Sequence, residues 1–195
     1  MSIFRKLYDW VLHWAETPYA VPALFILAFA ESSFFPIPPD VLLIALALSI
    51  PGKTFRYAAV CTFGSVLGGM AGYFIGYQLM DMVGVPILGF YGVMDKYEYI
   101  QALYMKYDAW AVGIAGFTPI PYKVFTIAAG AFKIDFPVFV MASIAGRAGR
   151  FLLVAGIIYF FGSAIKNLID KYFNLLTLIF IVLLIVGFLL IKYIF

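Results

Sequence analysis

The sequence predicts an all-α polytopic membrane protein, and three observations lead to this fold class. Hydrophobic residues make up 65% and charged residues 12% of the 195 residues, a balance far from that of soluble globular domains. Apolar runs long enough for the ~30 Å hydrocarbon core of a bilayer recur along the chain. A hydrophobic segment that is broken by prolines occurs twice. We therefore expect residues 1–195 to form a single membrane domain with the bilayer as its solvent.

The broken segment is an internal repeat, and its second copy begins 83 residues after the first. The Pro-Ile-Pro sequence at 36–38 recurs at 119–121, and a similar apolar stretch follows each copy. Proline removes a backbone donor and clashes with the preceding turn, so a straight helix is excluded there. Broken backbone at membrane depth must be buried in protein or line a water-filled cavity. We expect re-entrant hairpins at 34–50 and 109–131, with the turn prolines Pro36, Pro38, Pro39, Pro119 and Pro121.

The order of elements predicts an inverted-topology repeat. A re-entrant hairpin makes no net crossing, whereas the transmembrane helix after it, expected at 58–80 and at 137–162, makes one. Two consecutive copies must therefore have opposite orientations. Transporters often bind substrate near the bilayer midplane where the broken segments of such repeats meet. The alternative is a simple duplication of two Pro-kinked spanning helices.

Further helices are expected outside the two repeats. An amphipathic helix at 1–16 is expected to lie in the membrane interface, and a helix at 18–33 to lead into the first hairpin. A surface helix at 94–108 would link the halves, and an apolar helix at 172–195 would end the chain. The distribution of Lys and Arg slightly favours a cytoplasmic N-terminus.

Glycine recurs at every fourth position of the helix that follows the first hairpin. A stripe with almost no side chains lets another helix approach closely. We expect this stripe to serve helix packing within the chain. Its members are Gly64, Gly68, Gly72 and Gly76.

Charged side chains at membrane depth are costly and are therefore functional candidates. Desolvation should favour proton uptake by Glu31 and Asp40, which we assign to proton coupling. Lys123 occupies the repeat position that corresponds to Asp40, so these two side chains could pair. Arg147 and Arg150 are three residues apart and share a helix face, where two guanidiniums would suit a phosphate. We assign Lys123, Arg147 and Arg150 to lipid-phosphate binding; the alternative is a buried network that only neutralises itself.

Other classes of protein find little support in the sequence. The net charge is +3 without a basic block, so nucleic-acid binding is not expected. No recognisable metal, acyl-transfer or nucleotide motif occurs, so we expect neither an enzyme nor a cofactor or metal site. The single cysteine, Cys61, lies in an apolar run and is expected to be a packing residue.

Several motifs together resemble the DedA family of membrane proteins, also called the SNARE-associated or VTT-domain family, and within it the YqaA-like branch. They are the Glu-Ser-Ser-Phe-Phe-Pro-Ile-Pro-Pro-Asp sequence at 31–40, the glycine-rich span at 64–76, and the segments 116–123 and 128–130. The resemblance implies that Glu31 and Asp40 are the family's essential acids. The family's essential arginines in the second hairpin are replaced here by Gly116 and Tyr122.

The resemblance also implies a function. Family members are viewed as lipid transporters, so we expect proton-coupled translocation of a lipid phosphate such as undecaprenyl phosphate across the bacterial cytoplasmic membrane by a multi-pass protein. The expected partners are a polyprenyl phosphate or phospholipid and protons, and a homo-oligomer is left open. An uncoupled phospholipid scramblase is the main alternative. A membrane chaperone or scaffold without transport is a further one.

Overall fold

A computed structural model describes residues 17, 19–34, 38–92, 94–118, 120–162 and 164 of the chain. The described part consists of helices and connectors and contains no strand, which confirms the all-α class. The helices expected at 1–16 and 172–195, and the turn prolines Pro36 and Pro119, lie outside the described residues.

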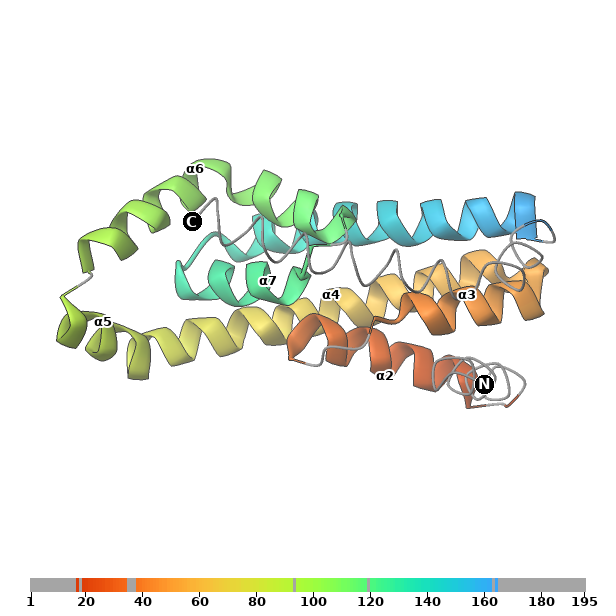
Figure 1. The fold of residues 1–195 in the computed structure, drawn as a ribbon, viewed down its shortest axis with the longest axis horizontal. Coiled ribbons are helices and arrows are strands. Elements are labelled where there is room, and N and C mark those ends of the chain that lie inside the picture. The colour runs from red at the N-terminus through yellow and green to blue at the C-terminus, as the bar shows by residue number, and fades with distance from the viewer. Residues whose placement is uncertain are drawn as a thin grey trace.

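The first broken segment forms a pair of helices. α2 spans Ala20–Ser33 and α3 spans Asp40–Ser49. Pro39 precedes α3 directly and has helical φ and ψ angles of −70° and −14°, because the proline ring fixes φ at a value that suits the start of a helix. In Figure 1, α2 runs from one end of the molecule to its middle, and α3 runs back towards that end.

A single long helical run follows α3. It begins with the 3₁₀ turn η1 (Pro51–Lys53) and continues through α4 (Thr54–Leu79), the π turn η2 (Met80–Gly84) and α5 (Val85–Tyr91). The helix thus begins earlier and ends later than the span expected at 58–80. Residues Pro51–Phe90 are apolar enough to cross a membrane, and at ~1.5 Å per residue this run is longer than a ~30 Å hydrocarbon core requires.

The second broken segment enters from the opposite end of the molecule (Figure 1). α6 spans Met94–Phe117 and has a non-helical residue, Tyr107, with φ −121° and ψ 15°. This kink lies next to the expected boundary between the surface helix and the second hairpin. α7 spans Tyr122–Ala131 and begins directly after Pro121, which has extended backbone angles. The last described helix, Phe136–Gly162, is also long and apolar enough to cross a membrane.

The glycines of α4 bring three helices together. A methyl group added to Gly64 or Gly68 would overlap backbone atoms of Phe25 or Phe29 in α2. The same change at Gly72 or Gly76 would overlap Thr126 or the Ile127 carbonyl in α7. One glycine stripe therefore packs α2 along its first half and α7 along its second half. Packing within the chain is the role that the sequence predicts for these glycines.

The apolar core is divided into two clusters along the molecule. One contains Cys61 of α4 together with Phe151 and Ala155 of the last helix. The other contains Tyr73 of α4 and Phe139 of the last helix. Many large apolar side chains lie on the outside, among them Phe63 (62% exposed) and Phe160 (74% exposed). Such an apolar exterior is typical of a protein whose surroundings are not water.

We predict that Gly68→Ala lowers the free energy of unfolding by about 1–3 kcal/mol, because the added methyl group forces α2 away from α4. The matched control is Gly156→Ala in the last helix, where a methyl group would meet no atom within 4 Å. This control should be neutral or stabilising by up to about 1 kcal/mol. Unfolding of the purified protein in mixed micelles with increasing dodecyl sulfate measures both. Equal stability of the two variants would contradict the packing role.

Candidate functional site

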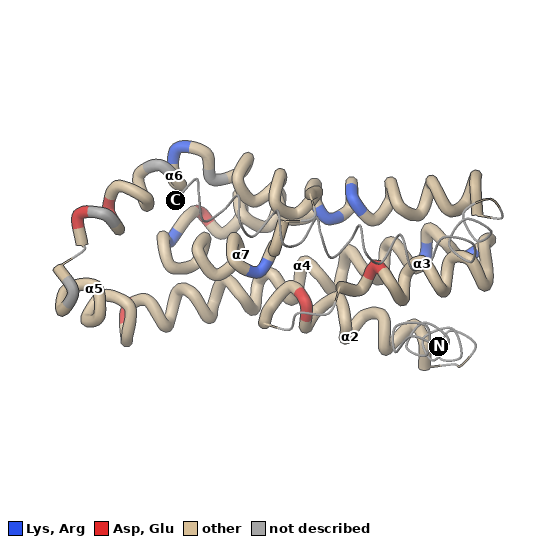
Figure 2. Tube along the Cα trace, in the orientation of Figure 1, with Lys and Arg blue, Asp and Glu red and all other residues tan. Residues whose placement is uncertain are grey.

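Charged residues gather between the two apolar clusters. Figure 2 shows acidic and basic positions near the middle of the molecule, flanked by long stretches without charge. Four of the five charged residues that the sequence singles out form two ion pairs there. Glu31 pairs with Arg147, and Asp40 pairs with Arg150.

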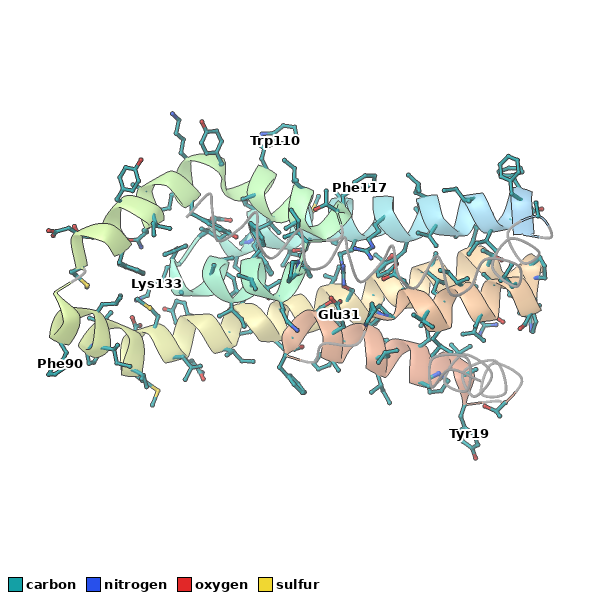
Figure 3. The ribbon with its side chains drawn as sticks, in the orientation of Figure 1. Tyr19, Glu31, Phe90, Trp110, Phe117 and Lys133 are labelled. Carbon is teal, nitrogen blue, oxygen red and sulfur yellow. The ribbon has the colours of Figure 1, made fainter. Side chains whose placement is uncertain are left out.

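Arg147 is the more buried of the two arginines, with 2% of its side chain exposed. Its Nη2 donates to the carboxylate of Glu31 and, over 2.9 Å, to Ser32 Oγ. Its Nε donates to Ser65 Oγ. The hydroxyl oxygens of Ser32 and Ser65 are themselves 2.6 Å apart, and Ser32 Oγ donates to Glu31 over 3.1 Å. Figure 3 shows Glu31 near the centre of the bundle.

Two aromatic rings complete the surroundings of Arg147. The guanidinium carbon lies 4.6 Å from the ring centre of Tyr122 and 5.1 Å from that of Phe151. A desolvated cation over an aromatic face gains roughly 1–2 kcal/mol. One carboxylate therefore neutralises the charge of Arg147, and two hydroxyls and two rings stabilise it further, as a buried cation requires.

Arg150 is more accessible than Arg147. One fifth of the Arg150 side chain and 19% of that of Asp40 are exposed. Arg150 Nη2 and Nε face the two oxygens of Asp40 at 2.8 and 3.4 Å. Its Nη1 donates to the backbone carbonyl of Thr118 over 2.9 Å. Asp40 is the first residue of α3, where the helix dipole also favours a negative charge.

Each arginine contacts both broken segments. Arg147 bonds to Glu31 and Ser32 at the end of α2 and lies over Tyr122 at the start of α7. Arg150 bonds to Asp40 at the start of α3 and to the residue that follows α6. Two side chains three residues apart on one helix thus connect four helix ends at the middle of the molecule.

Lys123 lies at the second position of α7 and is partly buried. Its backbone carbonyl accepts a hydrogen bond from Thr126 Oγ1 over 2.9 Å. The ion pair that the structure gives Asp40 is with Arg150. The assignment of Lys123 to phosphate binding stays a prediction, as do the roles assigned to the other four charged residues.

Sequence reasoning missed Ser65 and the two rings that hold Arg147. Ser65 lies beside the glycine stripe of α4 and precedes Arg147 by 82 residues, one fewer than the repeat offset, so residues at nearly equivalent places in the two halves bond to each other. This spacing was the available signal. Nothing in the sequence marks Phe151 among the many apolar residues of its helix.

A third ion pair lies apart from this site. Lys133 Nζ, in the connector after α7, is 2.8 Å from Asp81 in the π turn, and about half of each side chain is exposed. Hydrogen bonding to Asp81 raises the pKa of the Lys133 ammonium group. Within the described residues, no group of three His, Cys, Asp or Glu side chains could hold a metal ion.

We predict that Ser65→Ala lowers the free energy of unfolding by about 1.5–3 kcal/mol, because Arg147 Nε then lacks its acceptor in a buried site. The control is Thr62→Val on the same helix, which removes a hydroxyl bonded to its own helix at the Ala58 carbonyl. The control should change stability by less than about 0.5 kcal/mol. Denaturant unfolding in neutral micelles measures both changes, and an unaffected Ser65→Ala variant would rule out this support for Arg147.

Comparisons with known proteins identify relatives of the chain. The model of the VTT domain matches residues 37–160. An uncharacterized protein of Haemophilus influenzae is 34% identical over 192 residues, which cover 98% of this chain and all of the relative. An uncharacterized protein of Histophilus somni is 34% identical over 154 residues, which cover 79% of this chain and 80% of the relative. No solved structure matches the chain. The chain belongs to the VTT-domain family of membrane-associated proteins, also called the DedA or SNARE-associated family.

Proposed function

We propose that this protein carries out proton-coupled translocation of a lipid phosphate, such as undecaprenyl phosphate, across the bacterial cytoplasmic membrane. Membership of the family indicates a role in membrane transport in general terms. The observation that carries the narrower proposal is the pair of arginines on one apolar helix. Each is joined to an acid and to both broken segments of the chain.

The arrangement of the helices supports an inverted repeat of two re-entrant hairpins. The two broken segments enter from opposite ends and meet halfway along the molecule (Figure 1). The close packing of α2 on Gly64 has a counterpart in the second half, where a methyl group on Gly146 would overlap the carbonyl of Gly113. In transporters with such repeats, discontinuous helices form the substrate site near the bilayer midplane.

Arginine is well suited to the head group of a lipid phosphate. A guanidinium donates two parallel hydrogen bonds to two oxygens of a phosphate. A charged side chain at the centre of a bilayer costs at least ~2.5–3.5 kcal/mol. A phosphate group that crosses the membrane would carry a similar cost, which a fixed positive charge along its path would offset. The apolar exterior of the bundle would leave the acyl or prenyl chain in the lipid.

The two ion pairs support coupling of transport to protons. Each acid holds one guanidinium, Glu31 that of Arg147 and Asp40 that of Arg150. Protonation of a carboxyl group removes its charge and weakens its hold on the guanidinium. A carboxyl group that has taken up a proton therefore leaves its guanidinium free for a phosphate, so that the proton and the phosphate are bound at the same time. In this scheme Glu31 and Asp40 couple transport to the proton gradient, and Lys123 adds positive charge at the start of α7.

We further propose that the protein is a multi-pass protein of the bacterial inner membrane with its N-terminus in the cytoplasm. Both relatives come from bacteria, and two described helices are long and apolar enough to cross a membrane. A homo-oligomer is compatible with the apolar exterior.

Translocation by reconstituted protein tests the proposal. Proteoliposomes that contain a fluorescent polyprenyl phosphate should move it between leaflets faster than protein-free vesicles, as read from quenching by an impermeant reagent. Arg150→Gln and Glu31→Gln should each reduce the rate at least about tenfold, because each removes a charge from the site. Asp81→Asn, which removes the same charge from the distant exposed pair, should have little effect. Equal rates in all variants would reject the site.

A pH gradient separates the proposal from the alternatives. Coupled translocation should accelerate when protons flow in the same direction as the lipid phosphate, because the acid must be protonated while the phosphate is bound, and it should slow when the gradient is reversed. An uncoupled scramblase would give the same rate in both cases. A scaffold would give no translocation above that of protein-free vesicles.

A further inference from the structure

The two ion pairs differ in the exposure of their arginines, and this difference indicates different roles. Of the Arg147 side chain 2% is exposed, against 20% for Arg150. The acids differ less, with 17% of Glu31 and 19% of Asp40 exposed. A ligand that arrives from outside the bundle therefore meets Arg150 first.

The contacts of Arg147 leave no room for a phosphate to replace Glu31. Its Nε and Nη2 bond to Ser65, Ser32 and Glu31, and two rings lie within about 5 Å of its guanidinium carbon. Glu31 is held a second time, by the hydroxyl of Ser32. A phosphate could reach Arg147 only after these contacts between α2, α4 and the last helix had been broken, so Arg147 acts as a positioning residue.

Asp40 has fewer side-chain partners than Glu31 within the described residues. Both of its carboxylate oxygens face Arg150, and within the described part of the chain no other side chain donates a hydrogen bond to them. The carboxylate uses the two guanidinium nitrogens that two oxygens of a phosphate would use. It lies at the N-terminus of the ten-residue helix α3, where backbone amides also favour an anion.

We propose that Asp40 is an internal competitor that occupies the seat of a phosphate group on Arg150. The incoming ligand is a dianionic phosphate group, which displaces the carboxylate from Nε and Nη2. Arg150 remains anchored during this exchange, because Nη1 still donates to the Thr118 carbonyl of the second broken segment. The phosphate would then lie between the start of α3 and the break after α6.

This inference rests on the proposed function for the identity of the ligand, but it makes a separate prediction about whether a substitution strengthens or weakens ligand binding. Removal of an internal competitor strengthens ligand binding, whereas removal of a residue that holds the ligand weakens it. Asp40→Asn keeps the size of the side chain and removes its charge. We expect this variant to bind a phosphate group more tightly than the wild type, although it lacks one of the charges of the site.

Equilibrium binding to the full-length protein in neutral maltoside micelles tests the inference, with dodecyl phosphate as the probe. We expect Asp40→Asn to bind it about tenfold more tightly, and Arg150→Gln at least about tenfold more weakly, than the wild type. Asp81→Asn, which makes the same change in the exposed pair, should match the wild type. Unchanged or weaker binding by an Asp40→Asn variant that melts cooperatively would overturn the inference.

Arg150→Lys keeps the test decisive if Asp40→Asn does not fold. It retains a positive charge beside Asp40 but loses the paired nitrogens. It should bind the probe several-fold more weakly, and an unchanged affinity would overturn the inference.

Two further probes identify the source of the phosphate. Dodecanol, which has the same alkyl chain without the phosphate, should not compete with dodecyl phosphate. If it competed as strongly as dodecyl phosphate itself, the protein would recognise the alkyl chain alone, and the inference would be overturned. Inorganic phosphate should compete through the same seat; weaker competition than dodecyl phosphate favours a lipid, and equal competition favours a free phosphate. Because binding is measured without transport, failure to translocate a polyprenyl phosphate would reject the proposed function and leave this inference standing.

Discussion

A guanidinium group at the centre of an apolar helical bundle must find its counter-charge and its acceptors in the protein, because the bilayer supplies neither. Arg147 finds them on α2, on α4 and at the start of α7. Breaking a buried pair of this kind costs about 3–5 kcal/mol. The positions of these three helices relative to the last helix are therefore set by the needs of one side chain. Arg150 extends the same constraint to α3 and to the end of α6.

The polar layer interrupts a core that is otherwise apolar, and its place follows from the glycines of α4. Gly64 and Gly68 let α2 approach until Ser32 and Ser65 are in contact. Gly72 and Gly76 do the same for α7, which places Tyr122 beside Arg147. Larger residues on this stripe would hold the helices too far apart for a single guanidinium to reach all of its partners. Close packing and charge neutralisation are thus two aspects of the same arrangement.

Composition and the repeated prolines were sufficient to predict the helical class and the places where the helices stop. α3 and α7 begin directly after Pro39 and Pro121, because proline excludes a continuous helix. The partners of the charges were harder to predict. The repeat suggested Asp40 with Lys123, whereas the structure pairs Asp40 with Arg150, since the periodicity of the glycines predicts close packing but not which helix packs on the stripe or in which register. Tyr122 is one of the two residues that the resemblance to the family sets at the place of an arginine, and in the structure a guanidinium reaches it from the next helix.

The glycine stripe of α4 also bears on how the molecule can move. Interdigitated side chains lock two helices against sliding, because each ridge must climb over the next. A backbone that rests on glycine meets fewer such ridges, so a shift of α2 or α7 along α4 would require less repacking of side chains. Both helices would shift along the same glycine stripe, α2 on its first half and α7 on its second half, and the charged layer lies between them. A small shear of either helix would then change the distances within that layer first.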